Sequence, residues 1–291
     1  MAVVATGFFD GVHLGHRQVI RTLVSSARER GGEAIVVTFA PHPRAVLQQD
    51  AHNLRLLNSP QEKEALLRSL GVDRVETLRF DRAFARMTAA EYIRRILVGR
   101  FGATALVLGF DNRLGSDRLT PDLIVPIAES FGLEVIVVPP ALAVPEPAEV
   151  VSSTKIRKAL EKGRVEEAEA MLGYAYGLRG VVVSGKQLGR TLGFPTANLR
   201  LYDPLKLVPA RGVYLTGVEV LGGHYWGMTN VAEPIETHIF DFHEDIYGLD
   251  LEIRFRRWLR PMRSFDSLGD LSAQLAADEA ACRSLIPSFR A

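Results

Sequence analysis

Short runs of apolar residues alternate with helical patterns along the first half of the chain. The runs at 2–8, 34–39, 74–79, 103–108 and 134–138 are rich in β-branched residues and largely lack polar alternation. Such runs indicate strands buried on both faces, as in a parallel sheet. Between them, Ser59, Thr88 and Thr120 each supply a capping oxygen at the start of a predicted helix. The alternation predicts a doubly wound sheet, which binds ligands beyond the carboxyl ends of its strands.

The pattern changes after Pro147. Helices are predicted from about 152 to 163 and from 165 to 172, with Gly163 as a left-handed stop. Strands are then predicted at 180–184, 212–220, 225–231, 236–242 and 249–255, before a last helix from about Ser267. This order predicts an antiparallel β-barrel with a terminal helix. We therefore expect an α/β domain at 1–174 and an all-β domain at 175–291.

Composition narrows the classes of protein that the chain can belong to. A length of 291 residues allows two domains at about 150 residues each. Lys and Arg total 35 against 34 Asp and Glu, so no excess positive charge is available for a nucleic-acid backbone. The single cysteine, Cys282, cannot form an internal disulfide, which suits a reducing cytosol.

The location of the protein is also constrained by the sequence. The first ten residues lack a basic segment, and Pro139 and Pro140 interrupt the apolar run from Leu133. A cytoplasmic protein without a nucleic-acid or membrane partner is expected. The sequence leaves the oligomeric state open.

Residues 6–16 read Thr-Gly-Phe-Phe-Asp-Gly-Val-His-Leu-Gly-His, at the junction of the first strand and the first helix. His13 and His16 lie on the same side of a helix start, where free N–H groups attract phosphate. Gly11 and Gly15 leave room for a nucleotide. Imidazoles can donate hydrogen bonds to oxygens that gain charge when phosphorus is attacked in line. The pattern favours nucleotidyl transfer; a turn glycine with two surface histidines is the alternative interpretation.

A second anion-binding pattern opens the helix after the fifth predicted strand. Ser152, Ser153 and Thr154 supply hydroxyls, and Lys155 and Arg157 supply positive charge. The alternative is an ordinary N-cap with a solvated basic face. In a doubly wound sheet both helix starts can converge on one triphosphate.

His42 lies between Pro41 and Pro43, just beyond a predicted strand. The prolines hold it in an extended turn. A phosphate contact and a purely structural turn remain equal interpretations.

The predicted β domain contains a glycine-rich stretch, residues 185–198. Thr196 and Asn198 lie two residues apart in extended chain, so their oxygens project the same way and can bind one hard cation such as Mg²⁺. An ordinary turn is the alternative for Thr-x-Asn alone.

A strand further on carries a candidate base. Alternation places Glu236, His238 and Phe240 on one face of that strand. Glu236 could accept a proton from a hydroxyl within hydrogen-bond reach. A solvated strand glutamate is the alternative, and Trp226 and Trp258 are expected in the core.

These motifs, together with residues 37–44 and 109–118, resemble the bacterial bifunctional riboflavin kinase/FAD synthetase (FMN adenylyltransferase) family over nearly the whole chain. The resemblance implies a Rossmann-like nucleotidyltransferase domain followed by a riboflavin kinase barrel. It implies ATP-dependent phosphorylation of riboflavin to FMN, and adenylylation of FMN to FAD with release of pyrophosphate. ATP would be the co-substrate, with Mg²⁺ required.

The resemblance also implies roles for single residues. His13, His16 and Glu236 would be catalytic. The adenylyltransferase would bind ATP through Gly7, Phe8, Asp10, Gly15, Ser152, Ser153, Thr154 and Arg157, and flavin near Asp111, Asn112 and Arg113. The kinase would bind ATP through Gly185, Gly189, Arg190, Gly193 and Pro195, and Mg²⁺ through Thr196 and Asn198. Leu114 stands where the family often has Phe.

The chain departs from the family pattern before Glu236. Only residues 232–235 separate Val231 from Glu236, roughly ten residues fewer than the family usually has. A second hypothesis therefore keeps only the FMN adenylyltransferase, with the β domain serving flavin binding or oligomerisation. A non-catalytic flavin or nucleotide sensor is a third hypothesis.

Overall fold

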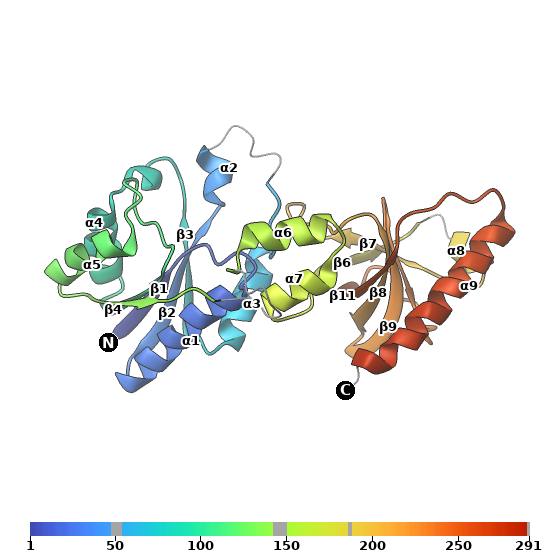
Figure 1. Ribbon diagram of the computed structural model, residues 1–291, viewed down its shortest axis with the longest axis horizontal. Coiled ribbons are helices and arrows are strands. Elements are labelled where there is room, and N and C mark those ends of the chain that lie inside the picture. The colour runs from blue at the N-terminus through green and yellow to red at the C-terminus, as the bar shows by residue number, and fades with distance from the viewer. Residues whose placement is uncertain (48–53, 142–149, 186–187, 290–291) are drawn as a thin grey trace. The chain divides into compact units, whose positions relative to one another are not determined.

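A computed structural model describes residues 1–47, 54–141, 150–185 and 188–289 (Figure 1). The chain divides into two compact units, Met1–Ser153 and Thr154–Ala291. Among the described residues, no helix combines the length and the apolar character needed to cross a membrane.

The first unit is built on a parallel sheet with the strand order β3-β2-β1-β4-β5. The strands are β1 (Ala2–Thr6), β2 (Glu33–Ala40), β3 (Arg74–Arg79), β4 (Ala103–Gly109) and β5 (Glu134–Val138). The central β1 pairs with both β2 and β4, and Val4 lies opposite Ile35 and Leu106. The strand order reverses between β1 and β4, so the carboxyl ends of these two strands border the crevice where such sheets bind ligands.

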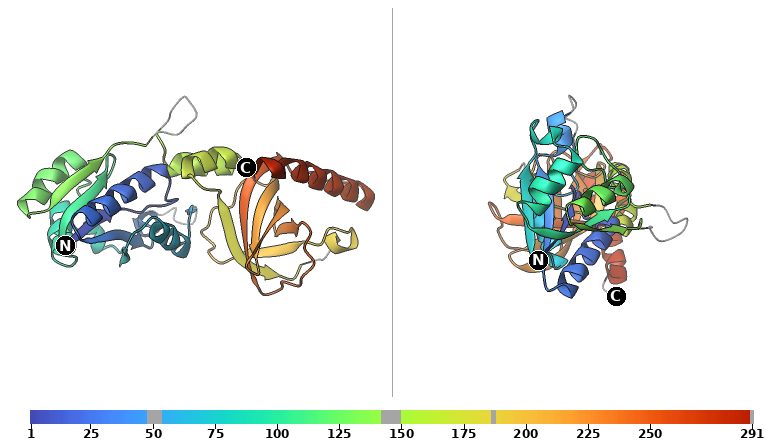
Figure 2. Two further views of the ribbon diagram at one scale, coloured as in Figure 1. Left: turned by 90° about the horizontal axis from the view of Figure 1, so that it is seen from below. Right: turned by 90° about the vertical axis from the view of Figure 1, so that its left-hand side faces the viewer.

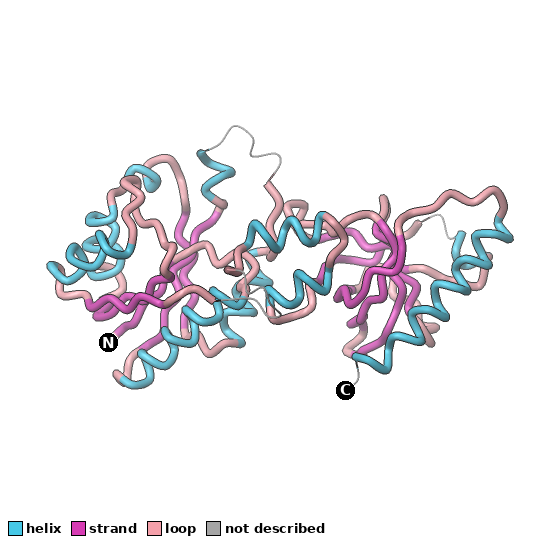
Figure 3. Tube along the Cα trace, in the orientation of Figure 1, coloured by secondary structure: helices cyan, strands magenta, loops and turns pink. Residues whose placement is uncertain are grey.

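Helices cover both faces of this sheet (Figure 3). One face packs against α1 (Leu14–Glu29) and α3 (Pro60–Ser69), and the other against α4 (Ala89–Tyr92), the π-helical η3 (Ile93–Val98) and α5 (Pro121–Ser130). Two short helices, α2 (Pro43–Leu47) and η2 (Phe84–Arg86), follow the ends of β2 and β3.

The predicted helix caps are only partly correct. Ser59 and Thr88 form capping boxes with Glu62 and Glu91, as expected. Thr120 is the N-cap of α5, but its side chain makes no capping hydrogen bond. The cap of α5 was therefore predicted wrongly, although the helix starts where the sequence indicates.

The second unit contains a closed barrel with the strand order β10-β7-β6-β11-β8-β9. The strands are β6 (Gly177–Val183), β7 (Ala197–Leu201), β8 (Gly212–Val220), β9 (Gly223–Val231), β10 (Ile235–Ile239) and β11 (Asp250–Arg260). The helices are α6 (Ser153–Glu161), α7 (Val165–Leu172), α8 (Leu188–Thr191), α9 (Leu268–Leu285) and η4 (Ile286–Phe289). The predicted α/β plus all-β class with a terminal helix is confirmed.

Several barrel strands differ from the predicted ranges; β6, for example, begins at Gly177 rather than at Gly180. β10 ends at Ile239 rather than at 242, because Asp241 has φ +55°, which extended chain cannot accommodate. β11 runs on to Arg260, well past the predicted end. β7 was not predicted as a strand, because its five residues directly follow the glycine- and proline-rich loop.

The helix pair α6–α7 packs on the barrel within the second unit. Gly163 adopts φ +74°, as predicted for a left-handed stop, and a Cβ there would lie 2.5 Å from the Trp258 ring. Trp258 also packs edge-on against Tyr214, with ring centroids 5.0 Å apart. Glu169 accepts a 2.9 Å hydrogen bond from Arg256 of β11. Trp258 therefore has a packing role, but it and Trp226 are only partly buried rather than in the core as expected.

The terminal helix α9 lies along one side of the barrel (Figure 2). Its contact is a cluster of buried residues that includes Leu215, Met228, Phe240 and Cys282. Burial raises the pKa of the Cys282 thiol to about 12. At the edge of this contact, Arg260 makes a 2.6 Å ion pair with Asp278, whose side chain is 6% exposed.

We expect this buried ion pair to stabilise the second unit strongly. Asp278→Ala leaves the Arg260 guanidinium buried without a counter-charge, so it should lower the free energy of unfolding by about 3 kcal/mol. The control is Glu167→Ala, which breaks an exposed i,i+3 pair with Arg164 and should cost less than about 1 kcal/mol. Urea unfolding followed by tryptophan fluorescence measures both; equal losses would contradict the prediction.

Candidate active sites

The loop from β1 to α1 has an unusual backbone. Phe9, Gly11 and Val12 have φ of +50°, +86° and +37°, in the left-handed region. Only glycine adopts such angles without strain, and each other residue costs of order 1 kcal/mol or more. The loop is held in place because the carboxylate of Asp10 accepts hydrogen bonds from the backbone N–H groups of Leu57 and Asn58. Asp10, predicted to bind ATP, therefore has an evident structural function.

His13 is the N-cap of α1, and its Nδ1 accepts a hydrogen bond from the backbone N–H of His16. Because Nδ1 is the acceptor, a neutral His13 carries its proton on Nε2. The two imidazoles stack, with centroids 3.6 Å apart and an angle of 16° between their planes. A Cβ at Gly15 would lie 3.2 Å from the His13 ring. Gly15 thus gives the His13 ring room over the helix start.

His16 is held in its neutral form. Burial, the neighbouring His13 and the Lys63 ammonium all lower the pKa of His16 well below its usual value. Its Nδ1 is buried and has no hydrogen-bond partner among the described residues. The sequence correctly predicts that the two histidines share one side of the helix start, but it does not predict their stacking.

Lys63 is a residue of this site that the sequence analysis missed. It extends from α3, and its ammonium donates hydrogen bonds to the Phe8 carbonyl oxygen at 3.1 Å and to Thr38 Oγ1 at 2.8 Å. Burial lowers the pKa of Lys63 to about 8, although nearby Asp10 opposes the shift. In the sequence, Lys63 is one charged residue in the first turn of a helix. Its contact with the loop that precedes His13 depends on the fold and not on near neighbours in the sequence.

The other predicted adenylyltransferase residues fall into three groups. Ser153 and Asn112 lie beside the loop and make structural bonds: Ser153 Oγ donates to the Asp10 carbonyl at 2.8 Å, and Asn112 Nδ2 donates to the Thr6 carbonyl at 3.0 Å. Gly7 and Phe8 lie in the loop after β1, and Ser152 lies just before α6. Asp111 and Arg113 follow β4 and are exposed. Thr154 and Arg157 belong to the second unit.

Aromatic rings gather at the carboxyl ends of β1, β2 and β3. Phe8 packs against Phe39 with ring centroids 5.3 Å apart and against His42 at 4.8 Å. Phe39 in turn lies 6.1 Å from Phe80. His42 thus has a packing role, beside which a phosphate contact stays untested. Leu114, the departure noted in the sequence, is buried in the core of this unit.

In the second unit, the predicted kinase loop packs directly against the predicted cation ligands. A Cβ at Gly185 would lie 2.3 Å from Asn198 Nδ2, and one at Gly189 would lie 2.3 Å from the Phe194 carbonyl oxygen. Gly193 has φ +84°. These three glycines are therefore required by the fold of the loop, whatever they bind. Lys186 and Gln187 of this motif lie outside the described residues.

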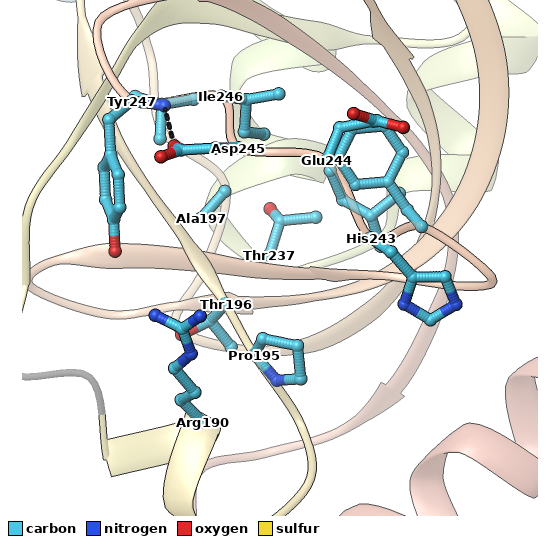
Figure 4. Close-up of a pocket in the computed structure, with 13 residues that line it drawn as sticks. Arg190, Pro195, Thr196, Ala197, Thr237, His243, Glu244, Asp245, Ile246 and Tyr247 are labelled. Carbon is cyan, nitrogen blue, oxygen red and sulfur yellow. Dashed lines mark hydrogen bonds between the residues drawn. The ribbon is translucent and has the colours of Figure 1, made fainter.

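A cavity of about 390 Å³ opens next to this loop (Figure 4). Arg190, Pro195 and Thr196 of the predicted ATP and cation sites line it, together with Thr237 and the segment 242–247. In Figure 4, the Arg190 guanidinium lies beside Thr196 at the edge of the cavity. The structure thus brings these three predicted residues together.

Glu236 lies in the middle of a row of polar side chains. In the barrel it is directly opposite Asn198 of β7 on one side and Asn230 of β9 on the other. The Oδ1 atoms of both asparagines are buried and, within the described residues, have no hydrogen-bond partner. Asn198, a predicted cation ligand, is only 4% exposed. Asn230 is not evident from the sequence as a residue of this site, because its position beside Glu236 depends on strand pairing.

The face predicted for Glu236 and His238 is correct. His238 Nδ1 donates a 2.8 Å hydrogen bond to the Pro195 carbonyl, next to Thr196. On the opposite face, Thr237 is fully buried and joins a chain of hydroxyls with Thr229 and Thr216. Within the described parts of the chain, no group of three or more His, Cys, Asp or Glu side chains is arranged to hold a metal ion.

The short connection before Glu236 forms a tight hairpin. Ala232, Glu233 and Pro234 join β9 to β10, and the two strands pair from Asn230–Glu236 to Gly227–Ile239. The shortened segment therefore leaves the barrel closed and Glu236 in register.

The charge of Lys63 can be tested by titration. The Lys63 ε-carbon should titrate with a midpoint near pH 8, and this signal should be absent in Lys63→Met. The folded state releases this proton at lower pH than the unfolded state. As the pH increases, the free energy of unfolding of the wild type should therefore rise relative to that of Lys63→Met. The expected rise is about 2 kcal/mol between pH 7.5 and 9.5.

NMR of labelled lysine and urea unfolding followed by circular dichroism measure the two effects. Lys158→Met, at an exposed position of α6, is the control. This variant should keep the Lys63 signal with its midpoint near pH 8 and the rise in unfolding free energy with pH. A Lys63 midpoint above pH 10 would contradict the prediction.

Comparison with known proteins covers both units. A family model described as FAD synthetase matches residues 1–155, and one described as riboflavin kinase matches residues 172–286. A protein of Listeria monocytogenes named bifunctional riboflavin kinase/FMN adenylyltransferase is 36% identical over 290 residues, covering 95% of this chain and 90% of its own. An Escherichia coli protein of the same name is 34% identical over 294 residues, covering 97% and 91%.

A solved structure is also similar to this chain over nearly its whole length. A crystal structure from Streptococcus pneumoniae, described as a macrolide-efflux protein, has a TM-score of 0.88 and 36% identity, covering 97% of this chain and 93% of its own. The chain therefore belongs to the bifunctional riboflavin kinase/FMN adenylyltransferase family.

Proposed function

We propose that this protein phosphorylates riboflavin to FMN with ATP and then adenylylates FMN to FAD, releasing pyrophosphate. The observation that carries the proposal is the presence of two sites of different chemistry on separate units: stacked histidines at a helix start, and a carboxylate between two asparagines whose side-chain oxygens are buried. Each unit overlaps one of the two matched family models. We assign the adenylyltransferase to residues 1–174 and the kinase to 175–291, since the riboflavin kinase match begins at 172.

The adenylyl transfer needs electrostatic stabilisation rather than a base. The attacking group is a phosphate oxygen of FMN, which already carries negative charge at neutral pH. As it attacks the α-phosphorus of ATP, charge moves onto the departing pyrophosphate. His13 Nε2–H, the amides at the start of α1 and neutral His16 are suited to donate hydrogen bonds to these oxygens. In this proposal Ser152, Ser153, Thr154 and Arg157 bind the triphosphate, and Asp111, Asn112 and Arg113 bind the flavin.

The kinase step needs a base, because the attacking group is a neutral hydroxyl. We assign the base to Glu236, which would take the proton of the primary hydroxyl of riboflavin as that oxygen attacks the γ-phosphorus; the bond from this phosphorus to the β,γ-bridging oxygen breaks and ADP leaves. Arg190, Pro195 and the loop glycines Gly185, Gly189 and Gly193 would bind ATP.

Thr196 and Asn198 fit a magnesium ion, because the Asn198 Oδ1 is buried without a partner. When bound, Mg²⁺ neutralises charge on the nucleotide phosphates.

The alternative of an FMN adenylyltransferase alone rests on the short connection before Glu236. The closed hairpin at residues 232–234 weakens this alternative, since Glu236 stays paired with both neighbouring strands. The relatives' names also include both activities.

Paired substitutions test the assignment of the two reactions. His16→Ala should lower FAD formation from FMN at least about 100-fold and spare FMN formation from riboflavin. Glu236→Gln should lower FMN formation by about 100-fold or more and spare FAD formation from supplied FMN. Chromatography that resolves riboflavin, FMN and FAD measures both. Equal loss of the two activities in either variant would contradict the assignment.

A further inference from the structure

The proposed kinase site leaves one buried side-chain oxygen, Oδ1 of Asn230, without a function. Asn198 and Asn230 flank Glu236 in the pairing of β7, β10 and β9. Side chains that are directly opposite on neighbouring antiparallel strands have Cβ atoms about 5 Å apart. A buried amide oxygen without a partner is destabilising, so two such atoms beside one carboxylate call for a ligand. The cation proposed at Asn198 would account for only one of them.

Within the described residues, the side-chain oxygen of Asn230 has no hydrogen-bond partner. The residue opposite it on β8 is the buried, apolar Val213. Two residues earlier on the same face of β9 is Met228, which packs against α9. Of the polar groups nearby on β10, His238 already donates to the Pro195 carbonyl. Glu236 offers only acceptors when ionised, so it cannot satisfy the oxygen of Asn230.

The two ends of the row Asn198–Glu236–Asn230 have different surroundings. The nucleotide-binding loop packs against the Asn198 end, where a Cβ at Gly185 would lie 2.3 Å from Asn198 Nδ2. Thr196, the other predicted cation ligand, directly precedes β7 at this end. Asn230 lies on β9, on the opposite side of Glu236. In an in-line transfer, the acceptor approaches the phosphorus from the side opposite to the leaving group. The Asn230 end is thus the side for the acceptor.

We propose that Asn230 binds the ribityl chain of riboflavin, through one or more of the hydroxyl groups next to the one that is phosphorylated. This inference rests on the proposed kinase function. A primary amide offers both acceptor and donor atoms, which matches a chain of neighbouring hydroxyls. Asn230 is then a specificity-determining residue, which selects flavins with a polyhydroxylated side chain and holds the terminal hydroxyl at Glu236.

The test is Asn230→Ala in the full chain. The KM for riboflavin should rise about tenfold, the change expected when a buried hydrogen bond is lost, while the KM for ATP changes less than about twofold. Lumiflavin has the flavin ring but no ribityl chain, and its inhibition constant against FMN formation should not change. Asn230→Ser, which keeps a hydroxyl, should recover part of the affinity for riboflavin. The matched variant Asn198→Ala should instead raise the KM for ATP and the Mg²⁺ concentration that gives half the maximal rate of FMN formation.

FAD formation from supplied FMN reports on the first unit and should be equal in all three variants; thermal unfolding reports on the barrel. An unchanged KM for riboflavin in Asn230→Ala would overturn the inference while leaving the kinase function intact. In Asn230→Ala, a raised KM for ATP or a parallel rise in the lumiflavin inhibition constant would also overturn the inference. A wild-type chain that forms no FMN would refute the proposed kinase function, and this inference with it.

Discussion

The adenylyltransferase site depends on a backbone conformation that the loop could not maintain alone. Phe9 and Val12 occupy left-handed backbone angles without being glycines. Groups from elsewhere in the first unit hold the loop: the N–H groups of Leu57 and Asn58 bind Asp10, and the Lys63 ammonium binds the Phe8 carbonyl. The strain is thereby offset by buried polar contacts, and its result is that His13 becomes the N-cap of α1.

Strand pairing has the corresponding role in the barrel. The hydrogen-bond register decides that Glu236 faces Asn198 on one side and Asn230 on the other. A slip of one residue in β10 would turn Glu236 toward the interior and expose Thr237. The buried hydroxyl chain of Thr216, Thr229 and Thr237 opposes such a slip, because the hydrogen bond between Thr229 and Thr237 would be lost. The register that pairs the buried threonines therefore also places Glu236 between the two asparagines.

Local chemistry explains what could be predicted from the sequence. The apolar runs of the first sheet, the capping boxes at Ser59 and Thr88 and the left-handed Gly163 depend on near neighbours in the chain. The shared side of His13 and His16 follows from helical spacing.

The features that were missed depend on distant contacts. Lys63 acts on a loop some fifty positions earlier, and Asn230 acquires its neighbour only through the register of β9 and β10. Two further errors show how tertiary structure overrides a local signal: Thr120 makes no capping bond, and the left-handed Asp241 ends β10 early. The roles of Ser153 and Asn112 were also underdetermined, since hydroxyl and amide groups serve structure and ligands equally well.

The burial of Cys282 between α9 and the barrel affects how the protein reacts with its chemical surroundings. The thiolate is the reactive form of cysteine, and a pKa near 12 leaves almost none of it at neutral pH. Since Cys282 is the chain's single cysteine, the native protein should resist thiol-directed alkylation and thiol oxidation. A cysteine introduced on the surface would then be the sole reactive thiol, so a spectroscopic label could be attached at one chosen position without removing a native residue.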